Sequence, residues 1–276
     1  MRAFRVGVAG LGLATVLLVG AARPSAQLPG EPVKESGLSV TGAFEGWYPN
    51  PDGSYSVLVG YFNRNSKQTF DIPVGPNNRI EPGGPDQGQP THFLPRRQWG
   101  VFTITVPKDF GKNKLTWTLV SNGQTTVIPM HLDPLWLVEP LKDAALGNTP
   151  PTLKFQPPGV PRQGPPNGTS ATYTAVVSSA LELSVWVTDD GIRAPEARRP
   201  ARLATVAWSK FRGPGAVTFA TPAPAIDEKT GEAKTTAAFS APGDYILRVQ
   251  ANDATGDGGG GFQCCWTNAH VRVTVK

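Results

Sequence analysis

Short runs of β-branched and aromatic residues, each ended by glycine, proline or a turn-forming pair, are the feature that most constrains this chain. Clear examples are 54–63 (SYSVLVGYFN), 100–106 (GVFTITV) and 115–120 (LTWTLV). Such runs are typical of β-strands, because glycine and proline interrupt helices and mark turns. The 276 residues include 31 glycines and 28 prolines, so interruptions are frequent. The sequence therefore predicts an all-β protein without an amphipathic helix of useful length.

Composition argues against two other classes of chain. Hydrophobic residues make up 39% of the sequence, enough to bury a core, and charged residues only 17%. An average soluble domain has about 25% charged residues. This balance argues against a disordered polyelectrolyte and against a coiled coil.

The first half contains the clearest hairpin signal. Alternation places Leu115, Trp117 and Leu119 on one face of a strand. Asn122-Gly123 then favours a type I′ turn into a second strand at 125–128, because both residues tolerate positive φ.

A stretch without periodicity, 75–95, is expected to be a long loop. It contains His92, and Arg96, Arg97 and Trp99 follow it. These four residues are a candidate polar rim for binding. The alternative, an ordinary surface loop with a solvated histidine, is favoured over it.

The second half repeats the strand signature with cleaner alternation. Three runs, 181–187, 244–251 and 271–275, point every second residue inward. The inward residues would be Leu181, Leu183, Val185, Val187, Tyr245, Leu247, Val249, Ala251, Val271, Val273 and Val275. Short strands at regular spacing with polar opposite faces predict a two-sheet sandwich.

A proline-rich stretch, 150–166, separates the two halves. Proline makes such a segment stiff and poor at joining a sheet. Two interpretations stay open: the stretch is only a linker, or residues 152–155, which alternate within it, form an edge strand, where proline is tolerated. We place the boundary near Gly147, which gives domains at 27–147 and 148–276.

The N-terminus has the pattern of a secretory signal peptide, expected at 1–26. Arg2 and Arg5 precede an uncharged run of 17 residues, 6–22, and Arg23 and small residues follow up to Ala26; Gly20 and Ala22 also fit the small residues before a cleavage site. The run contains four glycines and is shorter than the ~20 apolar residues of a membrane span, so an uncleaved anchor is the less favoured alternative. Cleavage after Ala26 lowers the net charge from +5 to +2, which leaves no basic footprint for nucleic acid. We therefore expect a secreted or periplasmic protein with no membrane span in the mature chain.

Four motifs of the second half occur in an order that resembles the polycystic kidney disease (PKD) domain and related bacterial immunoglobulin-like modules. They are 181–191 (LELSVWVTDDG), 206–219 (VAWSKFRGPGAVTF), 235–253 (TTAAFSAPGDYILRVQAND) and a closing VRVTV strand. The resemblance implies an extracellular β-sandwich used for adhesion, spacing or ligand presentation. The chain departs from the family in an insertion, 254–268, before the last strand. The first half looks immunoglobulin-like by strand count alone, so we expect two tandem immunoglobulin-like sandwiches.

The insertion holds the two cysteines of the chain, Cys264 and Cys265, side by side. Three interpretations stay open, in falling order: a vicinal disulfide, a crosslink between two chains, and a soft-metal site with His270. Adjacent residues of a strand point to opposite faces, which weakens the metal interpretation. We take Phe262, Cys264, Cys265, Trp266 and His270 as a candidate binding loop, and expect the indole of Trp266 to pack on its own sandwich.

Four aspartates are candidate calcium ligands. Asp189 and Asp190 follow one expected strand, and Asp253 and Asp257 follow another, so a PKD-like topology would bring them to one end of the sandwich. The more favoured alternative is that each aspartate caps backbone groups at a turn.

Motifs for catalysis are missing from the sequence. It contains no Gly-x-Ser-x-Gly elbow, His-Glu-x-x-His motif or phosphate-binding loop, and no nucleophile motif surrounds His92, His131 or His270. We therefore expect a non-enzymatic protein, a binding, adhesion or structural module without a required cofactor.

The ligand of such a module would be an extracellular protein or a polysaccharide. A carbohydrate-binding accessory domain would use aromatics such as Trp47, Tyr48 or Trp99. The alternative from another class is a metal-binding or redox-active envelope protein that uses the Cys-Cys-Trp loop.

Overall fold

The expected strands are present and pair in five sheets. The computed structural model describes residues 34–140, 143, 147–192, 204–253 and 264–276. The expected signal peptide, Phe262 and Asp257 lie outside these ranges. Within them there is no α-helix, and no helix has the length and hydropathy needed to cross a membrane.

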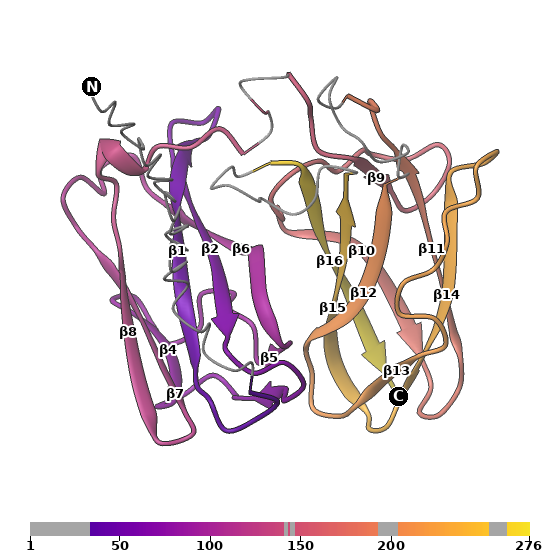
Figure 1. The fold of residues 1–276 in the computed structure, drawn as a ribbon, viewed down its shortest axis with the longest axis horizontal. Coiled ribbons are helices and arrows are strands. Elements are labelled where there is room, and N and C mark those ends of the chain that lie inside the picture. The colour runs from indigo at the N-terminus through magenta and orange to yellow at the C-terminus, as the bar shows by residue number, and fades with distance from the viewer. Residues whose placement is uncertain (1–33, 141–142, 144–146, 193–203, 254–263) are drawn as a thin grey trace, which may run out of the picture. The chain divides into compact units, whose positions relative to one another are not determined.

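The first-half strands are coloured indigo to magenta in Figure 1, and the second-half strands salmon to yellow. The first half contains β1 (Val40–Pro49), β2 (Tyr55–Asn63), β3 (Phe70–Asp71), β4 (Asn78–Glu81), β5 (His92–Phe93), β6 (Arg96–Val106), β7 (Leu115–Ser121), β8 (Gln124–Met130) and the 3-10 turn η1 (Pro134–Trp136). The second half contains β9 (Thr152–Lys154), β10 (Thr169–Ala175), β11 (Leu181–Thr188), β12 (Thr205–Arg212), β13 (Val217–Phe219), β14 (Glu232–Phe239), β15 (Gly243–Asn252) and β16 (Trp266–Val275).

Two three-stranded sheets, β1-β2-β6 and β4-β7-β8, enclose the core of the first half. Leu115, Trp117 and Leu119 are all buried in it, as the alternation predicted. Asn122 and Gly123 have φ of 46° and 74° and join β7 to β8, which confirms the predicted hairpin.

The expected loop at 75–95 is wrong in part, because it contains β4 and β5. β4 pairs antiparallel with β7, and its one buried apolar side chain is Ile80. The buried side chain of Asn78 holds the segment through hydrogen bonds more than apolar packing does. Its Nδ2 donates to the carbonyls of Ile72 and Pro90, and its Oδ1 accepts from the indole of Trp117. A strand held by one polar side chain shows no apolar periodicity, so the sequence pattern missed it.

Two four-stranded sheets, β10-β16-β15-β12 and β13-β14-β11-β9, form the second sandwich. The predicted inward residues enter its core, although Leu181 is only partly buried. β9 is an edge strand, the second of the two interpretations of the proline-rich segment. Both halves are therefore immunoglobulin-like two-sheet sandwiches.

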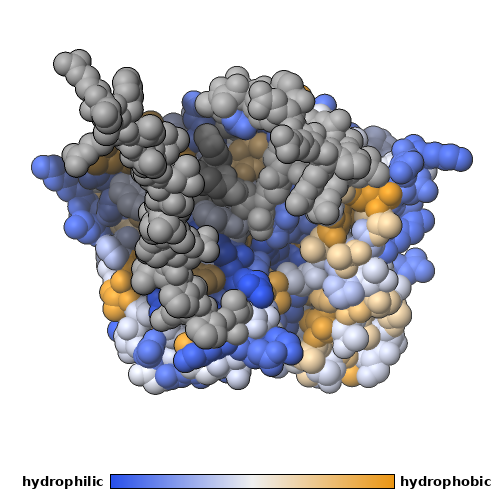
Figure 2. All heavy atoms as spheres, in the orientation of Figure 1, coloured by the Kyte–Doolittle hydropathy of each residue, from blue (hydrophilic) through white to orange (hydrophobic). Residues whose placement is uncertain are grey.

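The surface on the side shown in Figure 2 is mostly hydrophilic, as expected when each strand buries its apolar face and exposes its polar face. On this side, hydrophobic residues form small patches between hydrophilic ones.

Val33–Lys276 forms one compact unit, although no sheet contains strands from both halves. The boundary near Gly147 stays a prediction.

Candidate functional site at the seam between the sandwiches

Strand β6 of the first half contacts β15 and β16 of the second through side chains, and Phe211 of β12 packs in the core of the first half. We call this contact the seam, and define it by Glu45, Arg97, Gln98, Trp99, Gly100, Val101, Phe211, Arg248, Trp266, Asn268 and His270. It depends on an irregularity in β6, where the register with β2 shifts between Val59 and Tyr61. A bulge of this kind bends the strand and redirects backbone groups away from the sheet ladder.

Polar side chains of the second half bind the backbone of this bulge. The amide of Asn268 donates to the carbonyls of Trp99 and Gly100, both at 3.0 Å. His270 Nε2 lies 3.1 Å from the carbonyl oxygen of Val101, so this nitrogen carries the proton. Carbonyls that the bulge turns outward therefore gain partners from the other sandwich.

A buried arginine extends this network. Arg248 is 2% exposed. Its Nε donates to Asn268 Oδ1 at 2.7 Å and its Nη1 to Gln98 Oε1 at 2.9 Å. Buried charges are tolerated only when they are paired or hydrogen-bonded, and Arg248 meets this condition across the seam.

Glu45 supplies the matching carboxylate from β1. It is 5% exposed, accepts from Arg97 Nη2 at 2.5 Å and accepts from the backbone N–H of Gly100 at 2.7 Å. Burial raises the pKa of Glu45 to about 7, while the charges of Arg97 and Arg248 and the bond from Gly100 oppose the rise. The carboxyl group thus ties β1 to the bulge.

The apolar part of the seam is formed by Trp266 and Phe211. Trp266 is fully buried, and a Cβ placed on Gly100 would lie 1.9 Å from its indole Cη2. Gly100 has φ of +50°, so glycine is required there for both conformation and space. Phe211 joins the core of the first half and its ring lies 4.3 Å from that of His270. Trp266 is buried as expected, but its indole packs on Gly100 of β6 in the first half, whereas packing on its own sandwich was expected.

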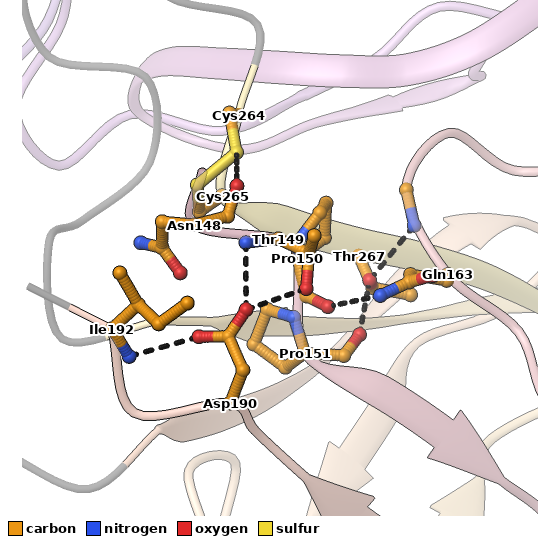
Figure 3. Close-up of a disulfide and its surroundings, with 11 residues drawn as sticks. Asn148, Thr149, Pro150, Pro151, Gln163, Asp190, Ile192, Cys264, Cys265 and Thr267 are labelled. Atoms are coloured by element: carbon orange, nitrogen blue, oxygen red, sulfur yellow. Dashed lines mark hydrogen bonds between the residues drawn. A yellow bond between two sulfur atoms is a disulfide. The ribbon is translucent and has the colours of Figure 1, made fainter. Parts of the chain in front are cut away.

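Cys264 and Cys265 form a disulfide with an S–S distance of 1.99 Å directly before Trp266. The vicinal disulfide, the first of the three interpretations, is confirmed. Both residues are buried, with Cys264 Sγ at 3.6 Å from the carbonyl oxygen of Asn148 (Figure 3). In this state neither sulfur is a thiolate, and Nε2 of His270 donates to the carbonyl of Val101.

Three of the four candidate calcium ligands come together. Carboxylate oxygens of Asp189, Asp190 and Asp253 lie within 4.8 Å of one another. Asp190 also accepts from the backbone N–H and the hydroxyl of Thr149 at 2.9 and 2.6 Å (Figure 3). Desolvation, then the charge of Asp253, raises the pKa of Asp189 to about 6. Cation binding by this cluster stays a prediction.

The candidate polar rim divides between two places. Arg97 stacks on the ring of Trp99, at 3.9 Å from its centroid, and belongs to the seam. His92 Nδ1 lies 3.0 Å from Asp71 Oδ1, and desolvation lowers the pKa of its ring. Arg96 is exposed, with φ of 67°.

Asp71 also binds Lys210 of the second half, at 2.8 Å. Asp71, His92 and Lys210 line an open cleft of about 860 Å³ between the sandwiches. Arg212, which also lines this cleft, forms a second ion pair between the halves, with Asp86 at 2.7 Å.

Two of the aromatics expected at a carbohydrate site are held by neighbours. The indole of Trp47 donates to the carbonyl of Asp133 at 2.8 Å, and Tyr48 is half-buried. A more exposed apolar turn, which the sequence reasoning missed, is η1, where Leu135 is 91% and Trp136 45% exposed.

Glu45, Arg248 and Asn268 were also missed by sequence reasoning. Alternation assigns Arg248 to the polar outer face of its strand, and its partner Gln98 is 150 residues away. Gly100, the first residue of the expected strand 100–106, lies inside the observed β6 and was the one local signal, because a glycine within a strand often marks a bulge or a close approach.

No family model matches this chain, and no curated protein matches it. Among solved structures it is similar to domains 4 and 5 of the S-layer protein SbsC, with 10% identity, 86% of this chain and 98% of that chain covered, and a TM-score of 0.25. The D00-D0 domain of intimin has 12% identity, 86% and 100% coverage and a TM-score of 0.26. The titin Ig tandem domains A164-A165 have 13% identity, 87% and 99% coverage and a TM-score of 0.22.

Proposed function

We propose that this chain is a non-catalytic binding or structural module, secreted or periplasmic, in which two immunoglobulin-like sandwiches act as one rigid body. The observation that carries the proposal is the seam. Arg248, Asn268 and His270 bind Gln98, Trp99, Gly100 and Val101 across it with hydrogen bonds of 2.9–3.1 Å. The indole N–H of Trp266 has no hydrogen-bond partner among the described residues, but the polar groups named above are hydrogen-bonded. Buried hydrogen-bonded networks of this kind favour one packing arrangement, so this contact holds one sandwich against the other.

The disulfide supports an exported location. Disulfides persist in oxidising compartments and are rare where cellular thiols keep cysteines reduced. A signal peptide at 1–26 would direct the chain to such a compartment. We also propose that residues 148–276 are a PKD-like domain.

The contacts of the histidines support structural roles for these side chains. His92 pairs with Asp71, and His270 is part of the seam. His131 Nδ1 accepts from the backbone N–H of Asp133 at 3.3 Å. A rigid sandwich pair positions loops at its ends, where a protein or polysaccharide ligand would bind.

The test uses the mature chain, 27–276, and envelope material from the producing cells. We expect saturable co-sedimentation of the protein with one envelope fraction. Protease treatment of that fraction abolishes binding if the ligand is a protein, and periodate abolishes it if the ligand is a polysaccharide. Absence of binding to every fraction would overturn the binding function.

Rigidity is tested separately by small-angle X-ray scattering. One arrangement of the two sandwiches should account for the scattering curve of the mature chain. A curve that requires a distribution of separated sandwiches would contradict the rigid body.

A further inference from the structure

The vicinal disulfide occupies the point where the seam begins. β15 and β16 pair up to Asn252 and Trp266, and one further bond, from the N–H of Asp253 to the carbonyl of Cys265, closes the ladder at 3.0 Å. The next side chain along β16 is Trp266, the indole that fills the space beside Gly100. The sulfurs are therefore one residue away from a principal apolar contact of the seam.

This crosslink joins no distant segments. The stabilisation that a disulfide gives through the unfolded chain grows with the length of the loop it closes, and this loop is the shortest one available. Its effect on the native protein is therefore local. It fixes the backbone that carries Trp266 into the seam.

The surroundings leave little room for two separate thiols. Cys264 and Cys265 are 4% and 3% exposed, Cys264 Sγ lies 3.6 Å from the carbonyl oxygen of Asn148, and the buried Trp266 is the next residue in the chain. Two unbonded sulfur atoms need more space than two bonded ones. In a close-packed interior the neighbours must then move, and the neighbour that follows directly in the chain is Trp266.

We propose that the Cys264–Cys265 disulfide is a redox latch for the seam, and that its reduction by a dithiol displaces Trp266 from Gly100 and loosens the contact between the sandwiches. A thiolate of the dithiol attacks one sulfur, the S–S bond breaks, and a mixed disulfide forms. The second thiol of the reductant then releases the cysteine. Two electrons and two protons pass to Cys264 and Cys265, and the reductant becomes a disulfide.

The test is hydrogen exchange of the mature chain with and without dithiothreitol at one pH. Reduction is verified by alkylation and intact mass. We expect the peptide that covers 96–102 in β6 to exchange roughly tenfold faster in the reduced protein. The β7–β8 hairpin, 115–130, is an internal control and should not change.

Two variants separate the latch from a general effect of the reductant. Cys264→Ser with Cys265→Ser should show the faster exchange without reductant and no response to it. Gly168→Ala, a glycine with φ of +62° and open space around it, should respond to the reductant like the wild type.

Unchanged exchange of 96–102 in fully reduced wild-type protein would overturn the latch, whether or not the double variant folds. Equal acceleration in the control hairpin would also overturn it, because the effect would then be global unfolding. Envelope binding by the oxidised protein is a separate measurement, so the latch and the proposed function can fail independently.

Discussion

Substitution of Gly100 by alanine tests the seam with a single methyl group. The new Cβ would lie 1.9 Å from Cη2 of Trp266, and ordinary carbon contacts are about 3.5 Å, so the indole or β6 must move by about 1.6 Å. The same position has φ of +50°, which alanine adopts at a cost.

The two costs can be separated by a matched control. Left-handed backbone costs a non-glycine residue about 1–2 kcal/mol, and overpacking a filled interior costs about 1–3 kcal/mol more. Gly168 has φ of +62° and no heavy atom within 4 Å of the place where an alanine methyl group would lie, so Gly168→Ala carries the backbone cost alone. We expect about 2–5 kcal/mol of destabilisation for Gly100→Ala and about 1–2 kcal/mol for Gly168→Ala.

The assay is urea unfolding of both variants and the wild type, followed by circular dichroism and tryptophan fluorescence. Trp266→Phe combined with Gly100→Ala should recover part of the loss, because the smaller ring leaves room for the methyl group. Equal destabilisation by the two glycine substitutions would refute close packing of Trp266 on Gly100.

The remaining predictions concern titration. The pKa of Glu45 is raised from 4.5 to about 7, so the folded form holds a proton that the unfolded form loses, and stability from this group falls as pH rises from 4.5 to 7. In urea unfolding, the free energy of unfolding of Glu45→Gln should rise by about 3 kcal/mol relative to that of the wild type between pH 4.5 and 7. A difference between the two proteins that does not change with pH would contradict this. Burial lowers the pKa of His270 from 6.5 to about 4, so its contribution is lost as pH falls from 6.5 to 4. His270→Gln should remove that loss of stability. If the free energy of unfolding of the variant falls between pH 6.5 and 4 as much as that of the wild type, His270 is not the cause. Asp253→Asn should lower the pKa of Asp189 in a carboxyl NMR titration, whereas an unchanged value would exclude the charge of Asp253 as a cause of the rise.

The sequence predicted most of the features that depend on the alternation of apolar residues in a strand and on turn-forming residues. Leu183, Val249 and Val271 are buried where alternation placed them, and Asn122-Gly123 forms the expected turn. These features depend on neighbours in the same strand or hairpin, so the sequence contains the information directly.

The seam could not be predicted in the same way. Alternation assigns Arg248 and His270 to the outer face of their sheet, and the rule that polar faces meet solvent gives them no partner. Their partners are Gln98 and Val101, which belong to the other sandwich. A polar face covered by a second domain has the same sequence pattern as one covered by water.

The place of β16 also decides how this protein would bear a mechanical load. β16 lies between β15, antiparallel to it, and β10, parallel to it, and the N–H of Lys276 donates to the carbonyl of Ala175 at 3.0 Å. A pull on Lys276 along β16 therefore acts in shear on hydrogen bonds to both neighbours at once. Bonds loaded in this way must break together, whereas an edge strand peeled from a sheet loses them one at a time. The strand that contributes Trp266, Asn268 and His270 to the seam is thus also the one that would resist tension at this end of the chain.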